Sequence, residues 1–345
     1  MKNKIPKWLI EMPKAELHCH LGGSMRLDTI LDLASNNHVR IPAKNKEELI
    51  KQVVFKNKEP KSLQAYLKGI KICESVLRKP EDFQRAAYEI CTDAAKENVK
   101  VMELRFGPTN YASKKLKLHE IVEGALDGLK KAETKFNMYT GLIICGIKTN
   151  MRATKRAVEI AINYQDRGVV GFDLAGKENK HSPKEFKEIF KPIFNNFLPV
   201  TIHAGEEDTV ESIKEALIHL HAKRIGHGVS LRENPKIIKY MDSVRIGLEV
   251  CPTSNIDTGS ISDISTHPVR DYFYRGLRVC INTDNRTISD TNLTKEYLLL
   301  QNELGFGKPE LLSLAKNGFK AAFMNNSDRR KILDEFDKKY GLLLK

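Results

Sequence analysis

The stretch KAELHCHL, residues 14–21, is a short apolar run that ends in two histidines and is the first of a repeating kind. Seven similar runs follow it, each rich in valine, isoleucine or leucine and ending near glycine, proline, asparagine or aspartate. Runs that are apolar on both faces are typical of a parallel sheet with helices on both sides. The predicted strands are Lys14–Leu21, Lys100–Gly107, Tyr139–Ile147, Val169–Ala175, Pro199–Gly205, Arg224–Gly228, Val244–Cys251 and Arg278–Asp284.

Segments with helical spacing of apolar residues lie between these runs. Pro80–Asn98 is the clearest, because Phe83, Ile90 and Ala94 recur on one helical face. Its proline suits a first helical turn. The other predicted helices are Leu118–Phe136, Arg152–Arg167, Pro183–Asn195, Thr209–His221, Asn234–Met241, Pro268–Arg275, Ser289–Glu303, Pro309–Met324 and Asp328–Tyr340.

The alternation of strands and helices predicts a parallel α/β sheet, and eight strands favour a closed (β/α)8 or TIM barrel over an open sheet. About 80 residues separate the first two strands, which leaves room for two or three extra helices over the carboxyl ends of the strands. Additional helices are also predicted at the C-terminus, after the eighth strand. Since no linker or low-complexity tract is evident, we expect residues 1–345 to form one domain.

Composition and charge exclude several classes of protein. Hydrophobic residues make up 41% of the chain, enough for one large core. The formal net charge is +13, but the lysines are scattered in ones and twos, which indicates a solvated surface rather than a nucleic-acid site. We see no apolar stretch near the ~20 residues that span a bilayer and no signal peptide. The six cysteines show no paired framework, so we expect a cytoplasmic protein. We also expect a monomer that acts on a small molecule.

Histidines and an aspartate end four of the predicted strands. His18 and His20 close the first strand, and residues two apart in a strand point to the same side. His203 closes the fifth strand, His227 the sixth and Asp284 the eighth. Each residue alone has an ordinary explanation, such as a structural histidine or a helix N-cap aspartate. In a barrel these strand ends converge on one cavity, where several imidazoles and a carboxylate together indicate a metal.

Zinc is the predicted metal because it accepts nitrogen and oxygen ligands, although iron, cobalt and manganese accept similar ones. Water activated by zinc attacks an electrophilic carbon, and the reaction also needs a proton carrier. Glu206 is the best candidate, since it follows His203 by three residues; its structural alternative is to begin the next helix. His227 could orient the water or deprotonate it. The remaining histidines are interpreted as structural, namely His38, His119, His181, His219, His221 and His267.

Seven blocks of sequence resemble the adenosine deaminase family of the metal-dependent amidohydrolase superfamily. The resemblance runs from about Ala15 to Asn325, and the order and spacing of the blocks make it specific. The segments LEVCPTSN (248–255) and NTDNRTISDTNLTKEY (282–297) look closer to bacterial adenosine deaminases than to the adenine-specific branch. The blocks are AELHCHLGGS (15–24), MELRFGP (102–108), DLAGKE (173–178), HAGE (203–206), RIGHGV (224–229), LEVCPTSN (248–255) and NTDN (282–285).

The resemblance implies a role for each chemically active residue identified above. Glu206 would protonate N1 of a purine and later assist the loss of ammonia. His227 would position the attacking hydroxide and stabilise charge at C6. The implied ligands of one zinc ion per chain are His18, His20, His203 and Asp284.

The same resemblance implies an enzyme that hydrolyses adenosine or 2′-deoxyadenosine to inosine or deoxyinosine and ammonia. Gly176 would offer its backbone to the purine N3. Other members of the superfamily deaminate adenine, methylated adenine nucleotides or intermediates such as aminodeoxyfutalosine, and these substrates stay alternatives. The residues implied to bind substrate are His20, Gly22, Gly176 and Asn285.

Two positions depart from the family pattern. Many relatives have an acid where this chain has Gly22, and that acid bonds the ribose 5′-hydroxyl. We therefore expect a weaker demand for a free 5′-hydroxyl and tolerance of 5′-modified adenosines. Asn285 stands where some relatives carry a second acid, and its amide can donate to the purine N7 without first being protonated.

Two competing classes of protein are less well supported. Related barrels that hydrolyse esters, amides or phosphotriesters often use two metals and a bridging lysine, but here the fourth strand ends in DLAG, residues 173–176, without one. A non-enzymatic basic binding protein should have lost a ligand or Glu206, yet all of these residues are present.

Overall fold

The computed structural model describes residues 5–55, 61–178 and 181–344, and this part of the chain contains one sheet of eight parallel strands. Each strand pairs with the next in sequence order. The sheet closes where the N–H of His20 donates to the carbonyl of Asp284 at 2.7 Å and the N–H of Asp284 donates to the carbonyl of His18 at 2.9 Å. The predicted (β/α)8 barrel is therefore confirmed. The strands are β1 (Lys14–His20), β2 (Val99–Phe106), β3 (Tyr139–Ile147), β4 (Val169–Ala175), β5 (Val200–Ala204), β6 (Arg224–His227), β7 (Gly247–Val250) and β8 (Arg278–Ile281).

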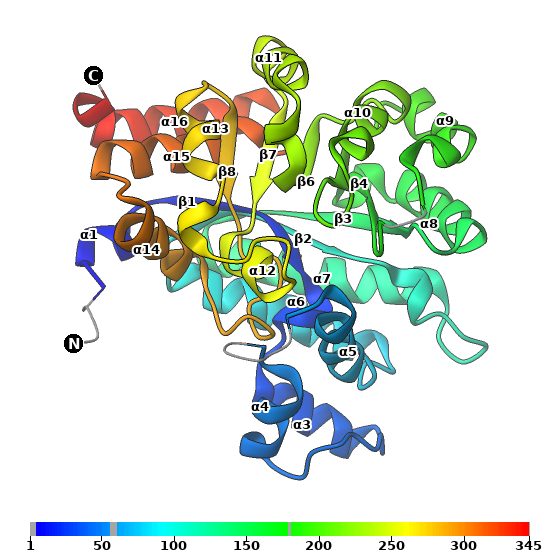
Figure 1. Ribbon diagram of the computed structural model, residues 1–345. Helices are drawn as coiled ribbons and strands as arrows, with labels where there is room; N and C mark the ends of the chain where they lie inside the picture. The colour runs from blue at the N-terminus through cyan, green and yellow to red at the C-terminus, as the bar shows by residue number, and fades with distance from the viewer. Residues whose placement is uncertain (1–4, 56–60, 179–180, 345) are drawn as a thin grey trace.

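Helices connect successive strands and cover the outside of the barrel (Figure 1). The helices from β2 to β8 are α7 (Leu118–Phe136), α8 (Met151–Asn163), α9 (Lys187–Asn195), α10 (Val210–His219), α11 (Pro235–Ser243), α12 (Pro252–Asp257) and α13 (Val269–Tyr274). A short helix α1 (Lys7–Glu11) precedes β1, and α14 (Leu293–Leu304), α15 (Lys308–Ala321) and α16 (Asn326–Tyr340) follow β8. Single 3-10 turns lie at Pro108–Asn110, Gln165–Arg167, Pro183–Phe186, Val229–Glu233, Ile264–Thr266 and Gly341–Leu344.

The long connection between β1 and β2 holds the predicted extra helices. It contains α2 (Leu21–Ser24), α3 (Leu27–Asn36), α4 (Lys46–Val53) and α5 (Leu63–Glu74) before the regular helix α6 (Pro80–Ala95). The connection therefore holds four extra helices among the described residues, where two or three were expected. Two of them are short, since α2 is a single turn of four residues and α4 has only eight. In Figure 1, α3 and α4 project away from the barrel, whereas α5 packs against α2 at the end of β1.

Several element ends differ from the sequence prediction by a few residues, and two of the differences have a clear local cause. The helix expected to begin at Ser289 begins at Leu293 instead, because the side chain of Asn292 accepts the N–H of Lys295 at 2.8 Å and caps the helix there. The six-residue helix α12, directly after β7, was not predicted. It is too short to show a helical repeat of apolar residues.

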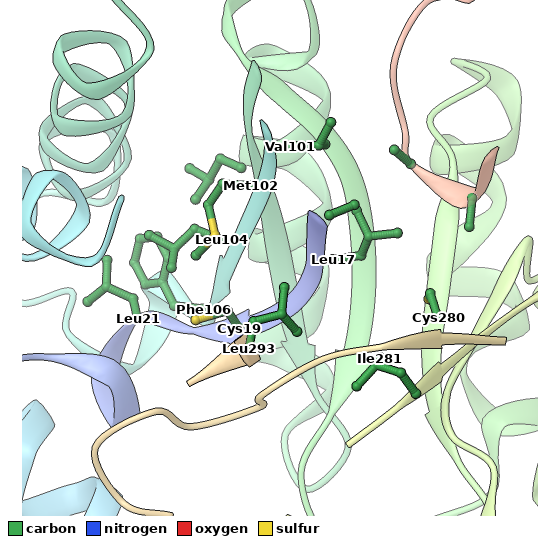
Figure 2. Close-up of a cluster of buried hydrophobic side chains, with 14 of the residues drawn as sticks. Leu17, Cys19, Leu21, Val101, Met102, Leu104, Phe106, Cys280, Ile281 and Leu293 are labelled. Atoms are coloured by element: carbon green, nitrogen blue, oxygen red, sulfur yellow. The ribbon is translucent and has the colours of Figure 1, made fainter. Parts of the chain in front are cut away.

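Buried apolar side chains fill the space between the strands and the surrounding helices. Figure 2 shows part of this core, with Leu17 of β1, Leu104 of β2 and Ile281 of β8 among the side chains drawn. All three are fully buried. Among the described residues, no helix combines the length and the apolar character that crossing a bilayer requires.

Candidate functional site

Three histidines and one aspartate from distant parts of the chain meet at the carboxyl ends of the strands. His18 and His20 come from β1, His203 from β5, and Asp284 lies just after β8. One ligand atom from each residue lies within 4.8 Å of those of the other three. His20 Nε2 is 3.2 Å from His203 Nε2 and 3.3 Å from Asp284 Oδ1. The structure thus brings together the four residues predicted to bind a metal.

The donor atoms of this cluster fit a divalent cation. Nε2 of His18 is buried and has no hydrogen-bond partner among the described residues. Its distance to Asp284 Oδ1 is 3.5 Å, so both atoms face the same small space. Three imidazole nitrogens and one carboxylate oxygen are ligands that Zn²⁺ accepts in proteins.

Two buried carboxylates orient the histidine rings from behind. His18 Nδ1 lies 2.9 Å from Glu249 Oε2, and His203 Nδ1 lies 2.9 Å from Asp173 Oδ2. An ionised carboxylate only accepts hydrogen bonds, so each ring donates from Nδ1 and turns its Nε2 lone pair toward the cluster.

Arginines inside the barrel keep these carboxylates ionised. Arg105 lies 3.1 Å from Asp173 and 2.8 Å from Glu249, and Arg224 Nε lies 2.5 Å from the other oxygen of Glu249. Burial alone would raise the pKa of Glu249, but the two arginines and His18 hold it far below its ordinary value. None of these partners had a role predicted from the sequence, although charged residues inside otherwise apolar strands were the available signal.

Glu206 and His227 lie beside the cluster. Glu206 Oε2 is 3.6 Å from His227 Nε2, and the two side chains are only 7% and 1% exposed. Burial, together with the nearby Asp284 and Glu178, raises the pKa of Glu206 well above its ordinary value. Its buried Oε1 has no hydrogen-bond partner among the described residues. A protonated carboxyl in this position can give a proton to a ligand in the cavity.

One carboxylate holds the loop that carries Glu206. Glu178 Oε2 accepts the N–H groups of Glu206, Glu207 and Asp208 at 3.0, 3.2 and 3.1 Å. Its Oε1 lies 3.1 Å from Lys148 Nζ. Because α10 begins after this loop, Glu206 is not in the first turn of that helix, which was the structural alternative for it. Glu178 ends the motif DLAGKE (173–178), but no role was predicted for it from the sequence.

A cavity of about 640 Å³ opens from the cluster. This volume lies within the range of small-molecule sites, roughly 300–1,000 Å³. One wall is apolar and comes from α5, with Leu63, Leu67 and Ile70. His18 lies outside the lining because it is fully buried. The other predicted site residues all line the cavity, namely His20, Gly22, Gly176, His203, Glu206, His227, Asp284 and Asn285.

Glu74, the last residue of α5, fills the space beside Gly22. A Cβ atom on residue 22 would lie 2.5 Å from Cγ of Glu74 and 2.8 Å from its Oε1. Glu74 also lines the cavity. Burial raises its pKa to about 7, although Tyr111 and Lys71 act in the opposite direction. The cavity therefore has an acid beside Gly22, although position 22 itself carries none. This acid was not predicted from the sequence, because Glu74 belongs to another element, α5.

A (β/α)8 barrel with three histidines and an aspartate gathered at its strand ends has the architecture of a metal-dependent hydrolase. Residues 13–339 match the family model described as adenosine deaminase. An adenosine deaminase from Clostridium acetobutylicum is 35% identical over 335 residues, which are 96% of this chain and 99% of that relative. The chain belongs to the adenosine deaminase family.

Two solved structures share the fold over nearly their whole length. An adenine deaminase from Arthrobacter aurescens has a TM-score of 0.88 at 26% identity, covering 94% of this chain and 98% of that one. An N6-methyl-AMP deaminase from Arabidopsis thaliana has a TM-score of 0.83 at 27% identity, covering 97% of this chain and 99% of that one. The proteins to which this chain is similar are thus named for a nucleoside, a base and a nucleotide.

Proposed function

We propose that this enzyme hydrolyses the 6-amino group of adenosine or 2′-deoxyadenosine and releases inosine or deoxyinosine and ammonia. The observation that carries the proposal is the position of Glu206 and His227 beside the four-residue cluster, at a cavity of suitable size for a nucleoside. The relative from Clostridium acetobutylicum is named for the same reaction.

We assign one zinc ion per chain to the cluster of His18, His20, His203 and Asp284. When bound, zinc supplies Lewis acidity that makes water nucleophilic near neutral pH. A single ion is favoured because β4 ends in Ala175, without the lysine that bridges two metals in distant relatives.

Glu206 is the proton carrier in this proposal. It donates its proton to N1 of the purine, which withdraws electrons from C6 and opens that carbon to attack by water. The resulting carboxylate accepts a proton from the water and delivers a proton to the departing amine. Over the whole reaction, the proton of Glu206 stays on N1. One proton of the water returns to Glu206 and the other completes the ammonia, so Glu206 ends protonated.

Two further residues are proposed to orient the purine. The N–H of Gly176 would donate to N3, and the amide of Asn285 would donate to N7. Both residues line the cavity, which supports these roles.

Glu74 favours a nucleoside over a free base. Its carboxyl can bond a hydroxyl of the sugar, a contact that free adenine cannot make. Lys71 and Lys177 also line the cavity, and their charges oppose any repulsion of a phosphate by Glu74. We therefore expect a preference for a free sugar hydroxyl, in place of the tolerance that Gly22 alone suggested.

A parallel assay of adenosine, 2′-deoxyadenosine, 5′-deoxyadenosine, AMP, adenine and aminodeoxyfutalosine tests these assignments, with ultraviolet absorbance and ammonia release as readouts. Adenosine and 2′-deoxyadenosine should react fastest, and Glu206→Gln should lower kcat by roughly 10²–10⁴-fold. Glu74→Gln should raise KM for adenosine more than for 5′-deoxyadenosine. Faster turnover of adenine or aminodeoxyfutalosine would contradict the proposal.

We also propose that the enzyme is a cytoplasmic monomer that acts on small molecules and not on nucleic acid. All six cysteines are unpaired and buried, which fits a reducing compartment. Gel filtration with light scattering tests the oligomeric state.

A further inference from the structure

A chain of hydrogen bonds leads from His227 away from the cavity. His227 Nδ1 lies 3.0 Å from the side-chain Nδ2 of Asn255, which belongs to α12. Asn255 Oδ1 lies 3.3 Å from Nε2 of His267, and His267 Nδ1 accepts the backbone N–H of Val269 at 3.1 Å. All three side chains are buried, so water does not compete for these bonds. His267 had no chemical role in the sequence analysis.

The backbone at the end of this chain fixes the direction of every bond in it. The N–H of Val269 can only donate, so Nδ1 of His267 must accept and the ring proton of neutral His267 must lie on Nε2. That Nε2–H needs an acceptor, which places the oxygen of the Asn255 amide toward His267 and its NH₂ toward His227. Nδ1 of His227 therefore accepts, and its proton lies on Nε2.

Burial keeps the ring of His267 neutral. Burial, with a smaller effect of Arg232, lowers the pKa of His267 to about 3. The backbone of Asn255 is fixed as well, because its carbonyl accepts the N–H of Ile261 at 2.9 Å.

We propose that Asn255 and His267 are positioning residues that hold His227 in the Nε2–H tautomer, so that His227 presents a hydrogen-bond donor to the reacting oxygen and is not its base. This inference rests on the proposed deamination. It assigns to His227 the role of orienting the water and not that of deprotonating it. It leaves Glu206, 3.6 Å from His227 Nε2, to accept the proton of the attacking water.

Asn255→Asp is the most direct test, because it changes one amide to a carboxylate of the same shape. The carboxylate accepts from both neighbours, so it moves the proton of His227 from Nε2 to Nδ1 and leaves no donor facing the cavity. We expect kcat for adenosine to fall by 10²-fold or more while KM changes less than threefold. The ¹⁵N chemical shifts of the His227 ring, measured in the metal-loaded protein without substrate, should show the exchange of protonated and unprotonated nitrogens.

Two substitutions of His267 separate this positioning role from a purely structural one. His267→Gln places an NH₂ where Nε2–H was and keeps the donor to Asn255, but loses the acceptor for Val269. His267→Asn keeps that acceptor and loses the donor. We expect His267→Asn to lower kcat at least tenfold with little change in Tm, and His267→Gln to retain most of kcat at a lower Tm.

The outcomes of this test distinguish two kinds of failure. A proton on Nδ1 of His227 in the unsubstituted protein, or His267→Asn with unchanged kcat and unchanged His227 shifts, would overturn the inference. If the unsubstituted enzyme does not deaminate adenosine, the proposed function fails, whereas the tautomer is still read from the shifts alone.

Discussion

His227 and Asp284 hold their backbones in the left-handed region, with φ of 63° and 61°. For residues with a side chain this conformation costs roughly 1–2 kcal/mol each. His227 ends β6 and Asp284 lies just beyond β8. Asp284 belongs to the cluster with His18, His20 and His203, and His227 lies beside it. Asp284 Oδ2 also accepts the hydroxyl of Ser254 at 2.6 Å, and Asn255 contacts His227. Helix α12 therefore orients both strained residues.

Glu178→Gln is predicted to disorder the loop that carries Glu206. The amide oxygen can still accept the three N–H groups, but the new NH₂ faces the ammonium of Lys148 and leaves it without its carboxylate partner. We expect kcat for adenosine to fall by roughly 10–100-fold, by analogy with other supporting contacts of an active site. Steady-state kinetics give the result, with the exposed neighbour Glu207→Gln as control. Equal kcat in the two variants would show that Glu178 does not position the loop.

At the scale of elements, α12 and α14 are joined through one buried carboxyl. Glu296 of α14 accepts the N–H of Thr253 at 3.0 Å and the hydroxyl of Thr291 at 2.5 Å. Burial raises the pKa of Glu296 to about 7, although these hydrogen bonds oppose the shift. The contact therefore anchors the helix that holds Asp284 and His227.

Replacing Glu296 by Gln should change how stability depends on pH. The carboxyl is protonated in the folded protein up to about pH 7 but ionises near pH 4.5 when unfolded, so the folded state binds more protons in this window. Its contribution to the free energy of unfolding is then greatest below pH 4.5 and decreases as pH rises to 7, by at most about 3 kcal/mol. The side chain of Glu296→Gln does not titrate. In urea unfolding, the free energy of unfolding of this variant should therefore rise relative to that of the unsubstituted protein between pH 5 and 8. The exposed Glu303→Gln on the same helix serves as control, and an equal gain there would contradict the assignment.

Close packing of α6 on α7 depends on a glycine. A Cβ at Gly128 would lie 2.3 Å from the carbonyl oxygen of Gln84, too close for any real contact. Gly128→Ala should therefore lower the free energy of unfolding by about 1–3 kcal/mol, although alanine favours helix by about 1 kcal/mol. Gly341→Ala is the matched control, because a Cβ there meets nothing closer than 3.8 Å. Urea unfolding measures both, and similar stabilities would show that α6 and α7 can move apart.

The elements that sequence predicts well are those with a long repeating pattern. β3 and β4 match their predicted ranges because both are mainly apolar runs, in which Asp173 is the one charged residue. α14 starts later than predicted because a side-chain cap at Asn292, and not the apolar pattern, sets its beginning. α12 has six residues and no pattern of its own, yet it supplies partners to two residues of the site.

In the complete barrel, residues that are far apart in the sequence lie together at one site. The four cluster residues could be predicted because each one ends a strand, and barrel strands end at a common mouth. Their supporting residues could not, because a buried charge in a strand gives no sign of its partner. Glu249 and Arg105 are examples, since their contacts follow from barrel closure and strand register.

The requirement of adenosine deamination for one cation, held by the cluster, is the part of the proposed function on which the other roles depend. Its most direct test is to strip the protein with a chelator and add Zn²⁺ stepwise while ammonia release from adenosine is measured, with Asp284→Ala in parallel. We predict that activity rises in proportion to zinc and stops rising at one ion per chain, and that the variant recovers none. Full activity in stripped protein, or a rise that continues to two ions per chain, would contradict the account.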